Sequence, residues 1–292
     1  MKYSETFYSP QGEGMYTGVS SLWIRFFLCN LQCDGFGQAF PTKPGTWDLP
    51  YENIDISQIK RVEDLPVFEK GCDSSYTWSK KFKHLMHDKT AEQAVDELES
   101  KLPTGTFIHA KSKQETHLCL TGGEPMMKHN QKAIIELFDE MLDRGNYPKF
   151  VTVETNGTQP ISDELFAFIQ QLRCDHGVEW MWSVSPKLFN VSGETRKKAI
   201  KPDNLYGYMS ASPKGQLKFV LNGSNEAWDE LEEVIPLFRE CGVGWDIWVM
   251  GIGGTLEGLK VTEATIAEKA IERGYNYSTR AHVHIFGNAI GK

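Results

Sequence analysis

A regular alternation of short apolar runs and helical patterns constrains the fold more than any other feature of this sequence. The runs are rich in β-branched and aromatic residues and predict strands over 21–28, 117–122, 149–156, 179–186, 216–223, 244–251 and 281–287. The amphipathic patterns between them predict helices over 90–102, 132–144, 163–173, 226–240 and 262–273. Strands that alternate with helices predict an α/β fold with right-handed crossovers, in an open sheet or a barrel.

Three residues give more detail on the predicted helices. Thr90, with Gln93 three residues later, fits a capping box. Ser162 is a good N-cap for the helix that follows it. Pro236 lies inside the helix predicted over 226–240, and we expect it to kink or shorten that helix.

Charge and hydropathy exclude several classes of protein. The 292 residues have a formal charge of −8, from 31 Lys and Arg against 39 Asp and Glu, so there is no excess of cations to bind nucleic acid. No apolar run reaches the roughly 18 residues that span a bilayer, and no apolar core of a secretory signal follows the N-terminus. We therefore expect a cytoplasmic protein without membrane association, whose six cysteines are not a disulfide framework.

Residues 34–71 interrupt the alternation. This stretch has four prolines, several glycines and little periodicity. A long irregular segment within a compact domain is usually functional or an insertion. No linker or repeat divides the chain, so we predict one domain over 1–292 that contains this segment.

The cysteines fall into two groups. Cys119, Cys174 and Cys241 have no metal-like spacing around them, and we predict that they are buried structural thiols. Cys29 and Cys33 are four apart after an apolar run, where both sulfurs can point at one metal, as in structural zinc sites. Three thiolates would instead suit an iron–sulfur cluster that keeps one iron open for a ligand.

Two other elements suggest a binding site. Gly122 and Gly123 follow an apolar strand and let the backbone approach a ligand, while the Glu124 carboxylate can accept from an ammonium group; a plain turn is the alternative. Arg25 lies in an otherwise apolar strand and needs a partner. That partner is either a substrate carboxylate or the carboxylate of a structural salt bridge.

The histidines carry less information than the cysteines. His282 and His284 are two apart in a predicted strand and would share a face. Without a third ligand we interpret them, with His109, His117 and His129, as structural residues and assign no second metal.

The cysteine pattern resembles the CxxxCxxC motif of radical S-adenosylmethionine (SAM) enzymes. Cys29 and Cys33 match its first two cysteines, but Phe36 stands where the third is expected. The segment 71–78, GCDSSYTW, resembles the part of the motif that begins with the third cysteine. The resemblance therefore implies Cys72 as the third ligand, with 34–71 inserted into the cluster-binding loop. Such a loop is tolerable because its closure cost grows only slowly with length.

Further motifs resemble the 7-carboxy-7-deazaguanine synthase family nearly from end to end. They are FYSPQGEG at 7–14, Gly18 and Arg25, TGGEP at 121–125, ETNGT at 154–158, SPK at 185–187, KFV at 218–220 and HIFGN at 284–288. The resemblance implies that the substrate is bound by Pro10, Gln11, Gly12, Glu13, Arg25 and Thr121. It implies SAM contacts for Gly71, Asp73, Gly123, Glu124, Ser185, Pro186 and Lys187. It also implies a Mg²⁺ contact for Ser74, whereas no residue is implied to be catalytic.

The resemblance implies a reduced radical SAM partial (β/α) barrel with about six parallel strands. The implied enzyme is a carbon–nitrogen lyase with a 4Fe-4S cluster, SAM and Mg²⁺. It contracts the ring of 6-carboxy-5,6,7,8-tetrahydropterin to 7-carboxy-7-deazaguanine with loss of ammonia, in the queuosine pathway. An external one-electron donor such as a flavodoxin and a homodimer are implied as well. The alternatives are a radical SAM glycyl-radical activase and a non-catalytic, metal-stabilised binding protein.

Overall fold

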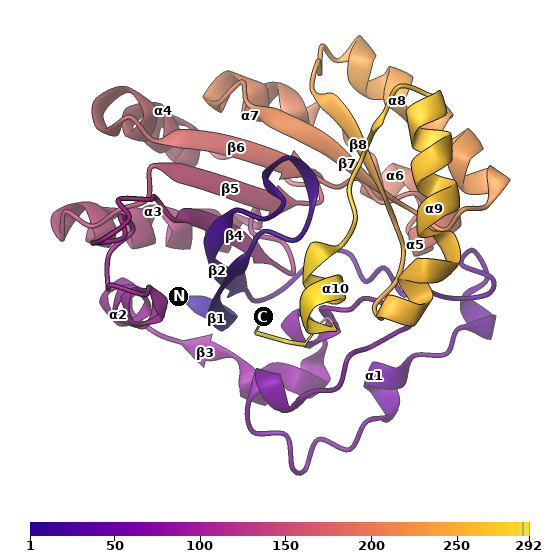
Figure 1. Ribbon diagram of the computed structural model, residues 1–292, viewed down its shortest axis with the longest axis horizontal. Helices are drawn as coiled ribbons and strands as arrows, with labels where there is room; N and C mark the ends of the chain where they lie inside the picture. The colour runs from indigo at the N-terminus through magenta and orange to yellow at the C-terminus, as the bar shows by residue number, and fades with distance from the viewer. Residues whose placement is uncertain (288, 292) are drawn as a thin grey trace.

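A mostly parallel sheet organises the computed structural model, which describes residues 1–287 and 289–291. Within these residues the sheet has nine strands in the order β3-β1-β2-β4-β5-β6-β7-β8-β9 (Figure 1). Their bounds are β1 Lys2–Pro10, β2 Ser20–Phe26, β3 His87–Asp88, β4 His117–Gly122, β5 Phe150–Thr155, β6 Glu179–Val184, β7 Gly215–Leu221, β8 Asp246–Gly251 and β9 Asn276–Tyr277. β1 is antiparallel to both of its neighbours, β3 and β2. The remaining neighbours in the sheet, from β2 through β4, β5, β6, β7 and β8 to β9, pair in parallel.

The predicted α/β class is confirmed. Six of the parallel strands have six or seven residues, namely β2, β4, β5, β6, β7 and β8. The sheet is open, because the described strands β3 and β9 at its two edges do not pair with each other. An open sheet of this kind is consistent with the partial barrel that the sequence predicts.

Helices follow the strands as the alternation predicts. The longer ones are α2 Ala91–Lys101, α3 Lys128–Asp143, α4 Asp163–His176, α7 Asn204–Ala211, α8 Asn225–Glu240 and α9 Leu256–Glu272. The short ones are α1 Pro50–Asn53, α5 Phe189–Ser192, α6 Arg196–Ala199 and α10 Ala281–Phe286, and single 3₁₀ segments lie at Gly14–Tyr16, Pro44–Thr46, Val62–Asp64, Ser75–Thr77 and Lys80–Leu85. The Thr90–Gln93 capping box and the Ser162 cap are both present. α8 continues past Pro236, so the expected shortening is wrong.

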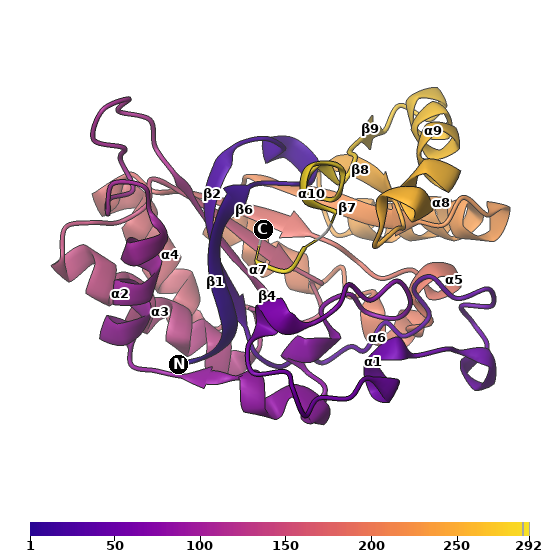
Figure 2. The same cartoon turned by 60° about the horizontal axis from the view of Figure 1, so that its bottom comes forward.

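The two faces of the sheet differ in chemistry. Successive strand residues point to opposite faces, and one set of alternate residues is apolar and packs against the helices, for example Leu118, Val153, Trp182 and Phe219. The other set includes Arg25, Thr121, Glu154 and Lys218, which line a cavity. Figures 1 and 2 show the segment 27–86 and α10 on the side of the sheet away from α3 and α4.

Two elements differ from the sequence prediction. Residues 281–286 form α10 and not a strand, so His282 and His284 do not share a strand face. A short apolar run fits either period, and Gly287 ends this helix in the left-handed conformation. β1 was not predicted, because its buried positions include the polar residues Ser4, Glu5 and Thr6. The partners of Glu5 and Thr6 lie far away in the sequence.

The segment 34–71 has a small core of its own. Its buried side chains Tyr51, Val62, Leu65 and Phe68 pack with Tyr76, Phe82 and Leu85 from the chain that follows. Its ends meet, because the Gly71 N–H donates to the Phe36 carbonyl at 2.7 Å. A segment that closes on itself in this way can enter the cluster loop without displacing the sheet.

Cys119 is buried as predicted, but the same prediction is wrong for Cys174 and incomplete for Cys241. Cys174 is exposed and Cys241 is half-buried. The buried stripe of α4 includes Ile169 and Leu172, and Cys174 is two residues beyond it, on the opposite side of the helix.

Among the helices that the structure describes, none combines the length and the apolar composition of a membrane-spanning segment.

Candidate active site

A cavity of about 310 Å³ opens at the carboxyl ends of the parallel strands, where ligands bind in such folds. Almost all of the predicted site residues line it, namely Pro10, Gln11, Gly12, Glu13, Arg25, Cys29, Cys33, Gly71, Cys72, Asp73, Ser74, Thr121, Gly123, Ser185 and Lys187. Glu124 and Pro186 are not among its lining residues. The structure therefore gathers residues that are up to 177 positions apart in the sequence, from Pro10 to Lys187, around one space.

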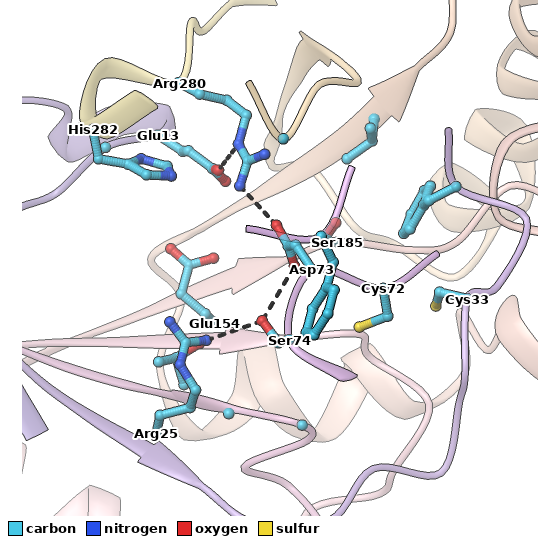
Figure 3. Close-up of a pocket in the computed structure, with 18 of the residues that line it drawn as sticks. Glu13, Arg25, Cys33, Cys72, Asp73, Ser74, Glu154, Ser185, Arg280 and His282 are labelled. Carbon is cyan, nitrogen blue, oxygen red and sulfur yellow. Dashed lines mark hydrogen bonds and ion pairs between the residues drawn. The ribbon is translucent and has the colours of Figure 1, made fainter. Parts of the chain in front are cut away.

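The three predicted cluster cysteines share this cavity. Cys29 and Cys33 follow β2, and Cys72 comes next to them because the Gly71–Phe36 hydrogen bond closes the intervening segment. Figure 3 shows the sulfurs of Cys33 and Cys72 close together. All three thiols are free, and burial raises the pKa of Cys29 to about 12 and that of Cys72 to about 11. Metal binding at these thiols must therefore release their protons.

The loop that carries Cys29 and Cys33 is held in a strained conformation. Leu28 and Cys33 have positive φ angles of 77° and 56°, which residues other than glycine rarely adopt. The Glu194 carboxylate accepts from the backbone N–H of Gln32 at 2.6 Å and of Cys33 at 3.1 Å. These bonds offset the strain and fix the direction of the Cys33 side chain.

The Gly122–Gly123 pair brings β4 against the cysteine loop. A Cβ on Gly122 would lie 2.4 Å from the Phe26 carbonyl oxygen, and one on Gly123 would lie 2.2 Å from that of Leu28. The Gly123 N–H donates to Phe26 at 3.1 Å. The absence of a side chain is thus needed for contact with the protein's own backbone, in addition to the predicted approach of a ligand.

Glu124 is held by hydrogen bonds from the protein itself. Its side chain is fully buried, and its two oxygens accept from Met126 N–H at 2.9 Å, Thr155 Oγ1 at 2.6 Å and Asn156 N–H at 2.8 Å. Burial raises the pKa of this carboxyl, and the hydrogen bonds partly offset the rise. Its carboxylate ties β4 to the end of β5, and its contact with SAM stays a prediction.

Glu13 is the centre of a buried ion-pair network. Lys218 donates to Glu13 Oε2 and to Glu154 Oε2, both at 2.8 Å. Glu154 also accepts from Gln11 at 3.1 Å and from Ser183 at 2.9 Å. Burial alone would raise the pKa of the Glu13 carboxyl, but the nearby cations outweigh it and hold that pKa well below its usual range. Glu13 is therefore ionised at neutral pH.

Arg280 joins this network to the cysteine segment. Its guanidinium donates to Glu13 Oε1 and to Asp73 Oδ2, both at 2.9 Å, and to the Gly253 carbonyl at 2.7 Å (Figure 3). Asp73 directly follows Cys72. Arg280 thus connects the turn after β1, the cysteine segment and the loop after β8.

Arg25 has the structural salt bridge that the sequence left open. Its Nε donates to Glu5 Oε1 at 2.6 Å, and Tyr76 donates to the same oxygen at 2.7 Å. Its Nη1 lies 3.4 Å from Ser74 Oγ, which donates to Asp73 at 3.2 Å. Among the described residues, Nη2 of Arg25 has no hydrogen-bond acceptor, so its N–H groups stay available in the cavity.

Sequence reasoning missed several cavity residues. Lys218 and Glu154 carried the same signal as Arg25, a charge in an otherwise apolar strand, and this signal would have identified them. Arg280 and His282 gave no such signal. Gly12 leaves room for His282, since a Cβ on Gly12 would lie 1.9 Å from His282 Nδ1. Burial, and to a lesser extent the positive charge of Arg280, lowers the pKa of His282 to about 4.

The donor set fits an iron–sulfur cluster better than a single ion. Within residues 1–287 and 289–291, no three His, Cys, Asp or Glu side chains are close enough to hold one metal ion. The three free thiols of the cavity are nevertheless soft ligands without another role. Several irons bridged by sulfide span more space than one ion. Thiols that are too far apart to bind one ion together can therefore still be ligands of one cluster.

Known proteins resemble the chain over nearly its whole length, although no protein-family model matches it. A 7-carboxy-7-deazaguanine synthase of Rhodopirellula baltica is 27% identical, with 99% of this chain and 87% of that protein covered. Proteins of the same name from Halobacterium salinarum (26% identical, 98% and 90% covered) and Pyrobaculum aerophilum (24%, 99% and 96%) are also similar. The crystal structure of QueE from Escherichia coli aligns over 96% of this chain and 94% of its own, with 18% identity and a TM-score of 0.48.

These relatives agree with the motifs that the sequence presents. The seven curated relatives that match most significantly all have one name. The last residue of the HIFGN motif, Asn288, lies outside the described residues. The chain is thus similar over nearly its whole length to proteins named 7-carboxy-7-deazaguanine synthase, as its motifs predicted.

Proposed function

We propose that the chain is a radical SAM lyase that converts 6-carboxy-5,6,7,8-tetrahydropterin to 7-carboxy-7-deazaguanine with loss of ammonia. The observation that carries the proposal is the position of Cys29, Cys33 and Cys72. Three free thiols from both ends of an inserted segment line one cavity, beside a buried network of acids and bases. The relatives' shared name supports the choice of reaction.

The cysteines are the proposed ligands of a 4Fe-4S cluster. Together with SAM, such a cluster supplies the radical chemistry that this ring contraction needs. The protein's part is to hold the thiols in place, which the Glu194 hydrogen bonds to the cysteine loop support. The enclosing segment 34–71 limits access of water to the cavity, because Val67, Phe68 and Glu69 form part of its wall.

The proposed substrate contacts are Pro10, Gln11, Gly12, Glu13, Arg25 and Thr121. The ionised Glu13 carboxylate suits the N–H groups on the amide-like edge of a pterin. The free Nη2 of Arg25 suits the substrate carboxylate, with Glu5 fixing the guanidinium plane from the other side. Lys218 and Arg280 hold Glu13 between them.

The proposed SAM contacts are Gly71, Asp73, Gly123, Glu124, Ser185, Pro186 and Lys187. Lys187 donates to Ser185 at 2.9 Å, so these two side chains form one polar edge of the cavity. Glu124 also fixes Thr155 and Asn156 at the end of β5.

A Mg²⁺ ion near Ser74 is a further part of the proposal. Ser74 donates to the Asp73 carboxylate, so one hydroxyl and one carboxylate are within reach of a common cation. Magnesium keeps several waters and substrate oxygens, so two protein ligands suffice. Omitting Mg²⁺ from the assay below tests this point: the proposal predicts slower turnover, and an unchanged rate contradicts it.

Three other features rest on the family resemblance. They are an external one-electron donor such as a flavodoxin, a homodimer and a cytoplasmic location.

The decisive experiment is anaerobic reconstitution with iron and sulfide, followed by incubation with SAM, dithionite and the carboxytetrahydropterin. The proposal predicts 7-carboxy-7-deazaguanine by mass spectrometry. Cys72→Ala should lose cluster iron and product, because it removes one of three ligands. Cys174→Ala is the matched control, since this thiol is exposed and lies outside the cavity.

Three outcomes would contradict the proposal. Full cluster content and SAM cleavage in Cys72→Ala would refute the ligand assignment. SAM cleavage without any pterin product would favour an activase that generates a glycyl radical on another protein, and no SAM cleavage at all would favour a metal-stabilised binding protein.

A further inference from the structure

We propose that the basic surface around α6 is the docking site for an acidic one-electron carrier protein. We call Arg196, Lys197, Lys198 and Lys201, together with Phe40 and Lys43, the α6 surface. This inference rests on the proposed function, because a cluster held by the three cysteines needs an electron from outside. It identifies where on the protein that electron enters.

α6 lies directly behind the cysteine loop. Ala199 of α6 is buried against Leu31 and Cys33. Glu194, just before α6, binds the backbone N–H groups of Gln32 and Cys33. A carrier that touches α6 is therefore separated from Cys33 by a single layer of packed residues.

The cysteine loop itself reaches the surface at this place. Gln32 is exposed, although Leu31 and Cys33 on either side of it are buried. Because electron transfer slows steeply with distance, the carrier must dock where the cover over the cluster is thin. The loop between Cys29 and Cys33 meets this requirement next to α6.

The charge of the α6 surface is opposite to that of the chain. Four cations occur within residues 196–201, whereas the whole chain has a formal charge of −8. Arg196 pairs with both Glu230 and Glu233, and Lys198 pairs with Glu194. Lys197 and Lys201 are exposed and have no ion-pair partner among the described residues. These two lysines are available to attract an acidic protein.

The inserted segment adds an aromatic side chain to the same surface. The loop with Phe40 packs beside α5 and α6, because a Cβ on Gly193 would lie 2.7 Å from the Trp47 ring and 2.8 Å from the Pro41 carbonyl. The Phe40 side chain is 55% exposed, and the Lys43 ammonium lies 4.9 Å from its ring centre.

An exposed aromatic ring among cations is suited to a small, transient interface. Aromatic anchors contribute much of the binding energy of interfaces, and encounters between redox proteins use small contact areas. The charges would bring the carrier to the surface, and the ring would contact it.

The test compares a protein donor with a chemical donor. The reconstituted full chain is assayed for product with an acidic flavodoxin kept reduced by its reductase, and separately with dithionite. The double variant Lys197→Glu/Lys201→Glu should lose at least tenfold in flavodoxin-supported rate at low ionic strength and should keep its rate with dithionite. The deficit should shrink as salt is added, because salt screens exposed charges. Titration calorimetry should show weaker flavodoxin binding.

The matched control is Lys80→Glu/Lys83→Glu, which makes the same charge change on a 3₁₀ segment that packs on the small core of residues 49–85. It should retain the flavodoxin-supported rate. An equal loss in both variants, or no loss in the α6 variant, would overturn the docking site. A wild-type chain that makes no product with dithionite would overturn the proposed function instead, while unchanged flavodoxin affinity in the α6 variant would overturn the docking site alone.

Discussion

The substitution Lys218→Met tests whether the buried network around Glu13 is held together by charge. Lys218 is almost completely buried and is the cation between Glu13 and Glu154, at 2.8 Å from each. Burial by itself lowers the pKa of Lys218, but the two carboxylates outweigh it and raise that pKa above its usual value. Methionine keeps a similar length and apolar stem without the charge.

The expected cost follows from what the substitution leaves behind. Removing one partner of a buried ion pair usually costs about 3–5 kcal/mol, because the other charge stays buried and uncompensated. Glu13 would still have Arg280, but Glu154 would keep only neutral partners, Gln11 and Ser183. We therefore expect a loss of about 3 kcal/mol, which corresponds to a decrease in Tm of about 6–12 °C for a chain of this size.

Thermal and chemical unfolding of the reconstituted protein provide the measurement. Lys132→Met is the matched control, because Lys132 is exposed and pairs with Glu136 at 3.7 Å, a contact worth less than about 1 kcal/mol. Adding Glu154→Gln to Lys218→Met should recover part of the loss, since no unpaired carboxylate is then left. Equal destabilisation by Lys218→Met and Lys132→Met would refute the reasoning, as would a double variant that is no more stable than Lys218→Met.

Three further predictions concern stability and the cysteine loop. Burial lowers the pKa of His117 from 6.5 to about 4. Because the unfolded chain then takes up the proton first, the free energy of unfolding should fall by up to about 3 kcal/mol between about pH 6.5 and about pH 4. In unfolding curves measured over this range, His117→Phe should show a smaller loss. Gly123→Ala places its Cβ 2.2 Å from a backbone oxygen and should cost at least about 1–3 kcal/mol with reduced iron content, whereas Gly244→Ala, with no atom within 4 Å of its Cβ, should retain wild-type iron. Glu194→Ala leaves the Cys33 N–H without its acceptor and should cost about 1–3 kcal/mol with slower cluster reconstitution, and normal reconstitution would contradict this role.

The sequence by itself determined most of the regular fold. The apolar runs at 117–122 and 179–186 became β4 and β6, and the Thr90 and Ser162 caps start their helices as predicted. These features depend on residues close together in the chain, so a local pattern is enough to predict them. The cavity position of Cys72 was also predicted, because the motif around it carried the information despite the insertion.

Only the tertiary structure decided which polar residues share the site and what they do there. Arg280 reaches Glu13 from 267 residues away, and Arg25 pairs with Glu5 through the register of β1 against β2. The TGGEP motif did not show that the Glu124 carboxylate accepts hydrogen bonds from Thr155 and the neighbouring backbone. Buried charges need partners, and which partner each one finds depends on strand order and chain closure, which no local stretch of sequence contains.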